Sequence, residues 1–177
     1  MSVLFNQCFV CAAMQPPTPD VVSRYLPLVS EDMSGSWLLD KSASDSLAPF
    51  VKHLGAPWAL QQLADTAVPT RTFTFSAVGV ADTQVTTGLM GRTQRQEWFW
   101  REAPMPLPIG GSFPSFATFS PDGRLAYRIA HPKGPIITVF DAVKRDGTRA
   151  TLTLQTMCFD KDQRKLLTMR RVFTRPL

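Results

Sequence analysis

The spacing of hydrophobic residues changes once along this chain, from a helical period to a strand period. Residues 44–67 carry two short apolar stripes, separated by Gly55, a natural helix stop, and by Pro57, which suits the first turn of a helix. Ser44 has the side chain of a helix N-cap. The stripes contain Leu47, Phe50, Val51 and Leu54, then Trp58, Leu60, Leu63 and Ala64. Helices this short are not stable alone, so we expect a helical pair that covers another element.

From Arg71 onward the hydrophobic period is two, which is typical of half-buried strands. Phe73 and Phe75, for example, alternate with threonines. Turn residues separate the strands, and the two Asp-Gly pairs at 122–123 and 146–147 are the strongest hairpin signals. The pattern predicts strands over 36–40, 71–76, 84–89, 94–101, 115–119, 125–131, 136–144, 149–159 and 166–174, with a Pro- and Gly-rich loop over 103–114. An antiparallel meander this long tends to close into a barrel.

The first 33 residues differ in composition from the rest. No charged side chain occurs between Met1 and Pro19, and residues 3–14 are mostly apolar. The uncharged start argues against a secretory signal peptide, and the scarcity of arginine argues against a mitochondrial presequence. Three prolines at 16–19 predict an extended connector, and residues 20–30 have the pattern of a short helix. We expect this segment to dock, either against its own barrel or against another chain.

Composition and charge narrow the class of protein. Of the 177 residues, 44% are hydrophobic and 19% are charged, as in ordinary globular domains. The net charge of +5 would either favour acidic partners, such as anionic lipid or an acidic protein face, or simply be solvated. Three cysteines, Cys8, Cys11 and Cys158, form no disulfide framework, which favours a reducing intracellular compartment such as the cytoplasm. No apolar run approaches the roughly 20 residues that span a bilayer.

The sequence contains no catalytic, metal or cofactor constellation. Cys8 and Cys11 form a lone C-x-x-C without a second pair. His53 and His131 are far apart and lack a neighbouring nucleophile, so we interpret both as partly exposed surface residues. Alternation within the aromatic run 98–100 favours a core role over base stacking. We therefore expect neither an enzyme nor a nucleic-acid-binding protein, and no cofactor or metal.

The order of the elements resembles one known family. The opening strand Gly35-Ser36-Trp37-Leu38-Leu39, the helix–turn–helix lid and the strand-only remainder together resemble the fatty-acid-binding proteins of the calycin superfamily. The likeness includes Arg171-Val172-Phe173, where the family carries Arg-x-Tyr. It implies an all-β fold, a closed antiparallel up-and-down β-barrel of about ten strands capped by a helical lid at 44–67. Residues 34–177 would form this barrel domain, and residues 1–33 an N-terminal extension or docking arm.

The resemblance makes Arg171 a carboxylate anchor inside the barrel, and the residues around it support this independently. One face of the last strand carries Leu167, Met169, Arg171 and Phe173. A charge in this apolar row is costly unless an acceptor meets it, either a ligand headgroup or an internal acid such as Asp141 or Glu97. In the alternative register Arg170 points inward and Arg171 is solvated.

Two departures from the family pattern affect the expected ligand site. Phe173 replaces the tyrosine whose hydroxyl shares the ligand carboxylate in the family, so one hydrogen bond is lost. The family's second arginine is not evident, because Thr151 and Leu152 occupy its place. Arg149 and Arg128 are the candidates to replace it. An eroded headgroup site of this kind also fits a barrel that has become a scaffold part.

Two hypotheses about function follow. The first is non-catalytic binding of a fatty acid or similar lipid in a cavity lined by Arg171, Phe173, Met169, Phe73, Phe75 and Trp98. The second is a structural or assembly subunit that keeps the barrel ligand-free and docks on protein partners through residues 1–33 and its basic surface. A microtubule wall or a large organellar complex would suit such a surface. The cavity discriminates the two, because a carrier needs open apolar volume and a scaffold can fill its interior.

Overall fold

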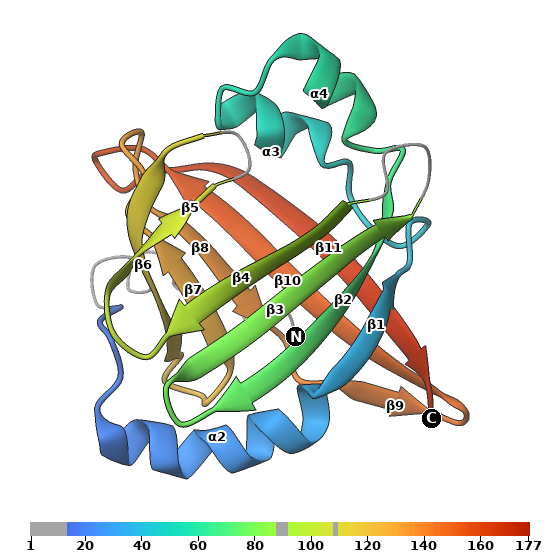
Figure 1. The fold of residues 1–177 in the computed structure, drawn as a ribbon, viewed down its shortest axis with the longest axis vertical. Helices are drawn as coiled ribbons and strands as arrows, with labels where there is room; N and C mark the ends of the chain where they lie inside the picture. Colours follow the sequence, from blue (N-terminus) through green and yellow to red (C-terminus); the bar gives the residue numbers. More distant parts are fainter. Residues whose placement is uncertain (1–13, 88–91, 108–109) are drawn as a thin grey trace, which may run out of the picture.

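The computed structural model of the chain describes residues 14–87, 92–107 and 110–177 (Figure 1). Its main feature is one antiparallel sheet of 11 strands that curls around a core, as the all-β prediction expected. The strands are β1 Gly35–Leu39, β2 Val68–Ser76, β3 Gly79–Thr87, β4 Arg92–Phe99, β5 Ala103–Pro106, β6 Ser112–Phe119, β7 Leu125–Ile129, β8 Ile136–Phe140, β9 Lys144–Asp146, β10 Arg149–Phe159 and β11 Lys165–Pro176. The helices are α2 Pro19–Met33, α3 Ala48–His53 and α4 Trp58–Leu63.

Neighbouring strands follow the order β4-β3-β2-β1-β11-β10-β8-β7-β6-β5, and β9 pairs with β10 off this path. The first and last strands of the chain meet in the middle of the sheet, where Leu39 aligns with Phe173. The sheet path ends at β4 and β5, and in the described ranges no ladder joins these two strands. Strand β4 nevertheless lies against β5 and β6. The sheet therefore curls until its two edges lie side by side.

Most of the expected strands are present with shifted ends, and residues 149–159 match β10 without a shift. The strand expected over 136–144 divides into β8 and β9. The expected loop at 103–114 was wrong, because β5 and β6 pair there with Met105 opposite Phe113. Proline is tolerated in β5 because this strand is at the sheet edge, where a missing N–H breaks no ladder bond. The last two residues of the expected strand 84–89 lie outside the described residues.

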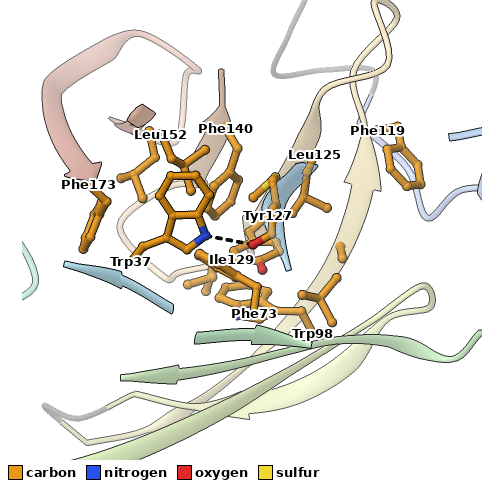
Figure 2. Close-up of a cluster of buried hydrophobic side chains, with 14 of the residues drawn as sticks. Trp37, Phe73, Trp98, Phe119, Leu125, Tyr127, Ile129, Phe140, Leu152 and Phe173 are labelled. Carbon is orange, nitrogen blue, oxygen red and sulfur yellow. Dashed lines mark hydrogen bonds between the residues drawn. The ribbon is translucent and has the colours of Figure 1, made fainter. Parts of the chain in front are cut away.

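Helix α2 covers one end of the curled sheet (Figure 1). Val22 and Met33 on this helix are buried and belong to the main core. Trp37 at the start of β1 is fully buried, and its Nε1 donates a hydrogen bond to the backbone oxygen of Met33 at 2.8 Å (Figure 2). The Arg175 guanidinium lies 4.3 Å from the centre of the Trp37 ring and donates from Nη2 to the Asp32 backbone oxygen at 3.0 Å. The helix predicted over 20–30 is therefore confirmed, and it is an integral part of the core.

The chain before α2 runs along the outer face of the sheet. The Thr118 hydroxyl on β6 donates to the Gln15 backbone oxygen at 2.9 Å, and Met14 packs against Ala126 and Ile137 on that face. Residues 1–13, which include the Cys8–Cys11 motif, lie outside the described residues. No helix in the described part of the chain is long and apolar enough to cross a membrane.

Helices α3 and α4 cover the opposite end of the sheet (Figure 1). Ser44 does not cap α3 as expected, because the helix begins only at Ala48. The Ser44 hydroxyl instead accepts a hydrogen bond from the Val172 backbone at 2.9 Å, which ties the lid segment to β11. A residue that follows both lid helices caps α3 instead. An Asp65 carboxylate oxygen accepts a hydrogen bond from the Leu47 backbone N–H at 2.6 Å.

The second predicted lid helix is confirmed, but its apolar residues do not form a covered surface. Trp58 is 72% exposed, and Leu60 and Leu63 are also exposed. Neither α3 nor α4 contains a buried residue. The lid is therefore in contact with the sheet mainly through the stripe that begins at Leu47.

Candidate ligand-binding cavity

A cavity of about 350 Å³ lies inside the curled sheet beneath α3. This volume is at the small end of the roughly 300–1,000 Å³ that is typical of small-molecule sites. The whole apolar stripe of the first lid helix faces it, namely Leu47, Phe50, Val51 and Leu54. The opposite walls come from strands far apart in the chain, β2 to β4 on one side and β7, β8, β10 and β11 on the other. The fold thus produces a partly open cavity with an apolar ceiling.

Four of the six site residues expected from the sequence line this cavity, namely Trp98, Met169, Arg171 and Phe173. Phe73 does not, because its buried ring packs edge-on against Phe140 with centroids 5.7 Å apart. Phe75 lies two residues further along β2 and is packed against the core. Both phenylalanines point inward as expected, but they lie toward the α2 end, where side chains such as Trp37 fill the interior (Figure 2).

Arg171 is only 8% exposed and lines the cavity, whereas Arg170 is exposed. The alternative register, with Arg170 inward, was therefore wrong. The suggested internal partners were also wrong, because Asp141 accepts from Arg124 Nη1 at 2.9 Å and Glu97 pairs with Arg95 at 3.1 Å between Nη2 and Oε1. These acids lie elsewhere because each strand alternates its side chains between the two faces of the sheet.

In the described part of the chain, the Arg171 guanidinium makes no hydrogen bond and no ion pair. Burial lowers the pKa of Arg171, and the positive charge of Arg71 adds to this, while the nearby carboxylates of Asp65 and Asp45 act in the opposite direction. The wall of the cavity therefore presents a desolvated cation with donors free to bind an acceptor.

A second inward arginine, Arg71 on β2, was not identified from the sequence. Its Nε donates to Asp82 Oδ1 at 3.2 Å, and Nη2 pairs with the other carboxylate oxygen. Its guanidinium lies over the rings of Phe73, Phe140 and Phe173 at 5.2, 5.8 and 5.5 Å. Burial by itself lowers the pKa of Arg71, but the charge and hydrogen bonds of Asp82 outweigh it and hold that pKa above its ordinary value. This arginine is thus already neutralised by a buried acid.

The two replacements suggested for the family's second arginine were wrong. Arg149 is on the outside, where Nη2 donates to the Thr174 hydroxyl at 3.0 Å. Arg128 lies over the Phe116 ring at 5.7 Å and does not line the cavity. A signal for Arg71 was present in the sequence, because it precedes Phe73 by two residues and therefore shares its face.

Tyr127 on β7 is a further cavity residue that the sequence reasoning missed. The side chain is 2% exposed, and its ring stacks on Trp98 with centroids 4.0 Å apart. Its hydroxyl makes no hydrogen bond with any described residue. Burial raises the pKa of Tyr127 well above the ordinary value, and the charge of Asp82 adds to this. The hydroxyl is therefore a neutral, unpaired donor at the cavity wall.

The remaining candidate groups do not form a reactive site. His53 and His131 are partly buried, as expected, and the fold brings them close enough to interact electrostatically. Burial raises the pKa of the Cys158 thiol to about 12, which keeps it protonated and unreactive at neutral pH. In residues 14–87, 92–107 and 110–177, no three His, Cys, Asp or Glu side chains are grouped to hold a metal ion.

Comparison with solved structures identifies the fold. A fatty acid-binding protein of Schistosoma mansoni, solved with arachidonic acid, is 22% identical with a TM-score of 0.58 over 81% of this chain and 96% of that chain. The fatty-acid-binding protein 1 of Echinococcus granulosus is 12% identical, with a TM-score of 0.59 over 82% of this chain and 98% of that one. A fatty acid transporter, REP1-NXSQ, is 13% identical, with a TM-score of 0.59 over 81% and 95% of the two chains.

Sequence comparison adds nothing to this, because no family model and no curated protein matches the chain. Identities of this size support the architecture alone. The chain has the fatty-acid-binding-protein-like calycin fold, which confirms at the level of the fold the resemblance drawn from its sequence.

Proposed function

We propose that this chain is a non-catalytic carrier that binds a fatty acid, or a similar lipid with a carboxylate headgroup, inside a closed β-barrel. The observation that carries the proposal is the guanidinium of Arg171, a desolvated cation on the cavity wall that makes no hydrogen bond or ion pair with the described residues and interacts with Asp65 and Asp45 only at longer range. A buried charge of this kind is costly unless an anion meets it. A ligand carboxylate would supply that anion and two acceptor oxygens for the guanidinium.

The surroundings of Arg171 suit the rest of such a ligand. Met169 and Phe173 flank it on the same strand, and the apolar stripe of α3 forms the ceiling. A hydrocarbon chain that leaves water for these walls gains about 25 cal/mol per Å² of buried apolar surface. The headgroup and the chain would therefore bind by different forces at neighbouring places in one cavity.

Closure of the sheet into a barrel is part of the proposal. The edge strands β4 and β5 lie side by side without a ladder, and a surface pocket lined by Gln94, Glu97 and Pro104 follows this seam. Helix α2 covers one end and the lid covers the other. Ligand in such an enclosure is shielded from water on all sides, as a carrier requires.

The alternative hypothesis, a structural subunit with a filled interior, is less well supported. The lid end encloses open volume, whereas only the α2 end is filled with aromatic side chains. Docking on a protein partner, through residues 1–33 or through the basic surface, is compatible with both proposed functions. We place the carrier in a reducing cytoplasmic compartment, in keeping with its free, buried Cys158.

The test compares two neighbouring arginines. Binding of oleic acid is measured by titration calorimetry and by native mass spectrometry for the wild type, Arg171→Met and Arg170→Met. Loss of a charge-assisted hydrogen bond is worth about 1.5–3 kcal/mol, so we expect Arg171→Met to weaken binding by about 10- to 100-fold. Arg170→Met removes the same charge from the outer face and serves as the matched control. Equal effects of the two substitutions, or no binding by the wild type, would overturn the carrier and favour the structural subunit.

A further inference from the structure

The cavity is more polar than a plain hydrocarbon chain requires, and its polar groups form two rows that cross the strands. The first row runs through Tyr127, Thr138 and Thr156, which align across β7, β8 and β10. The hydroxyls of Thr138 and Thr156 share a hydrogen bond of 2.9 Å. All three side chains line the cavity. Three hydroxyl-bearing side chains on neighbouring strands therefore border the space that the ligand would occupy.

The second row lies on the opposite wall. Arg71, Gln84 and Gln94 align across β2, β3 and β4, and Gln96 lies two residues further along β4. All four line the cavity. None of the three glutamine amides makes a side-chain hydrogen bond to a residue in the described ranges. Each amide has two donor hydrogens and an acceptor oxygen, so this wall also offers unpaired hydrogen-bonding capacity.

The unpaired groups determine which chain fits. Methylene groups placed against the Tyr127 hydroxyl would leave it buried without a partner. A site built to hydrogen-bond an oxygen discriminates strongly against an analogue that lacks it, because the unpaired protein groups then pay the desolvation penalty. The Trp98 Nε1 donor, stacked beside Tyr127, is likewise buried and unpaired. Two stacked rings in this wall thus each carry a buried, unpaired donor.

We propose that the ligand is an acidic lipid with a hydroxyl or keto oxygen on its hydrocarbon chain, and that the Tyr127 end of the hydroxyl row binds that oxygen. The inference rests on the proposed function, since it takes Arg171 as the carboxylate anchor. It goes further by assigning a second binding station to a different wall and by naming the class of lipid. A saturated fatty acid without a chain oxygen is then the poorer ligand.

The spacing of the two stations fits such a molecule. Thr156 aligns with Met169 on β11, and Arg171 lies two residues beyond Met169. Strands are about 4.8 Å apart and rise about 3.4 Å per residue, so Tyr127 and Arg171 are separated by at most roughly 16 Å along the wall. The curl of the sheet shortens the direct path. The chain oxygen therefore belongs near the middle of a long acyl chain, well separated from the carboxylate.

The experiment compares stearic acid with 12-hydroxystearic acid, which have the same headgroup and the same chain length. Affinities are measured by titration calorimetry for the wild type and for Tyr127→Phe. Because one neutral hydrogen bond changes an affinity by about tenfold, we expect the wild type to bind the hydroxy acid about tenfold tighter. Tyr127→Phe should remove this preference, so that the variant binds the two acids with equal affinity. Tyr25→Phe, at the only other tyrosine of the chain, is the matched control on α2.

A second pair of variants keeps the test independent of Tyr127. Thr156→Val should reduce the preference, whereas Thr153→Val, the same substitution on the other face of β10, should not. Binding of neither acid by the wild type would overturn the proposed function itself. Equal affinities for the two acids, or a preference that survives Tyr127→Phe, would be consistent with a fatty-acid carrier. Either result would overturn only the inference that Tyr127 binds an oxygen on the acyl chain.

Discussion

The two ends of this sheet are closed by helices in different ways. At the α2 end a 15-residue helix is continuous with β1, contributes Val22 and Met33 to the core, and is fastened through Trp37 and Arg175. At the lid end two six-residue helices contain no buried residue and expose Trp58 to solvent. The first closure is part of the core, whereas the second is a cover over a cavity.

The difference indicates which end is built to open. Local opening costs least where few apolar groups are buried, so the lid end belongs to the low-stability part of the molecule. The lid is also the only one of the two ends that adjoins the cavity. A ligand would therefore enter and leave beneath α3 and α4, while α2 keeps the rest of the sheet fixed.

The largest expected difference is in the free energy of unfolding, between a substitution of Trp37 next to α2 and one of Trp58 on the lid. Trp37→Ala removes a fully buried ring and its hydrogen bond to Met33, and should lower the free energy of unfolding by about 3–5 kcal/mol. Trp58→Ala removes an exposed ring and should change it by no more than about 0.5 kcal/mol. Urea denaturation measures both. Similar losses for the two variants would show that the lid is as much a part of the core as α2.

A smaller effect is expected at the lid attachment. The Asp65 carboxylate accepts hydrogen bonds from the Leu47 backbone and the Ser46 hydroxyl, and so caps α3. Asp65→Ala should cost about 1 kcal/mol and should speed ligand release, because the lid opens more often. Hydrogen exchange of residues 47–63 and stopped-flow release of a fluorescent fatty acid measure this. Glu31→Ala removes the same charge from the exposed face of α2, and should leave both rates unchanged.

The smallest expected effect is a pH dependence at the lid end. The Lys133 ammonium donates to the His53 backbone oxygen at 2.7 Å, joining α3 to the β7–β8 turn. Burial lowers the pKa of His53 and of His131 below 6.5, and the charge of Lys133 adds to this in both. Below pH 6.5 the unfolded chain therefore binds more protons than the folded chain. The stability that the two neutral histidines contribute is fully present above pH 6.5 and is lost as the pH falls below that value.

The measurement is the unfolding midpoint at pH 7.5 and at pH 5.0, with hydrogen exchange to locate the change. Protection should fall at the lid and not at α2. The variant His53→Gln with His131→Gln should lose most of this difference between the two pH values. Carboxyl groups with lowered pKa, such as Asp65 and Asp40, stabilise the fold at both pH values and lose this contribution only as the pH falls below about 3.8. A fall in protection at α2 instead of the lid would contradict the assignment.

Much of the architecture could be predicted because it depends on local patterns. Alternation identified nearly every strand, and the Gly-Ser-Trp strand followed by a helical pair indicated the calycin order. Alternation on β11 placed Arg171 in one row with Met169 and Phe173, but it left open whether this row or that of Arg170 faces inward. The β5–β6 hairpin was missed because four prolines in 103–114 signal a loop, and only the position of β5 at the sheet edge makes Pro104 and Pro106 acceptable in a strand.

The partners of the site could be predicted less well. Arg71 shares a face with Phe73, but its pairing with Asp82 depends on the register of β2 against β3. The mistaken choice of Asp141 and Glu97 as partners of Arg171 has a different origin, since alternation places these acids on the face opposite to their inward neighbours Phe140 and Trp98. Register is set by long-range packing and by turn geometry, which short windows of sequence do not contain.

By itself, the sequence determined the elements, their order and the faces of their side chains, because periodicity and turn chemistry are properties of a few neighbouring residues. The tertiary structure leaves Arg171 without a hydrogen bond or ion pair among the described residues, pairs Arg71 with Asp82, and brings Tyr127, Thr156 and the glutamines to one cavity. These facts depend on how far the sheet curls and on what each wall then faces. Such distances arise from the closing of the whole sheet, and no single strand specifies them.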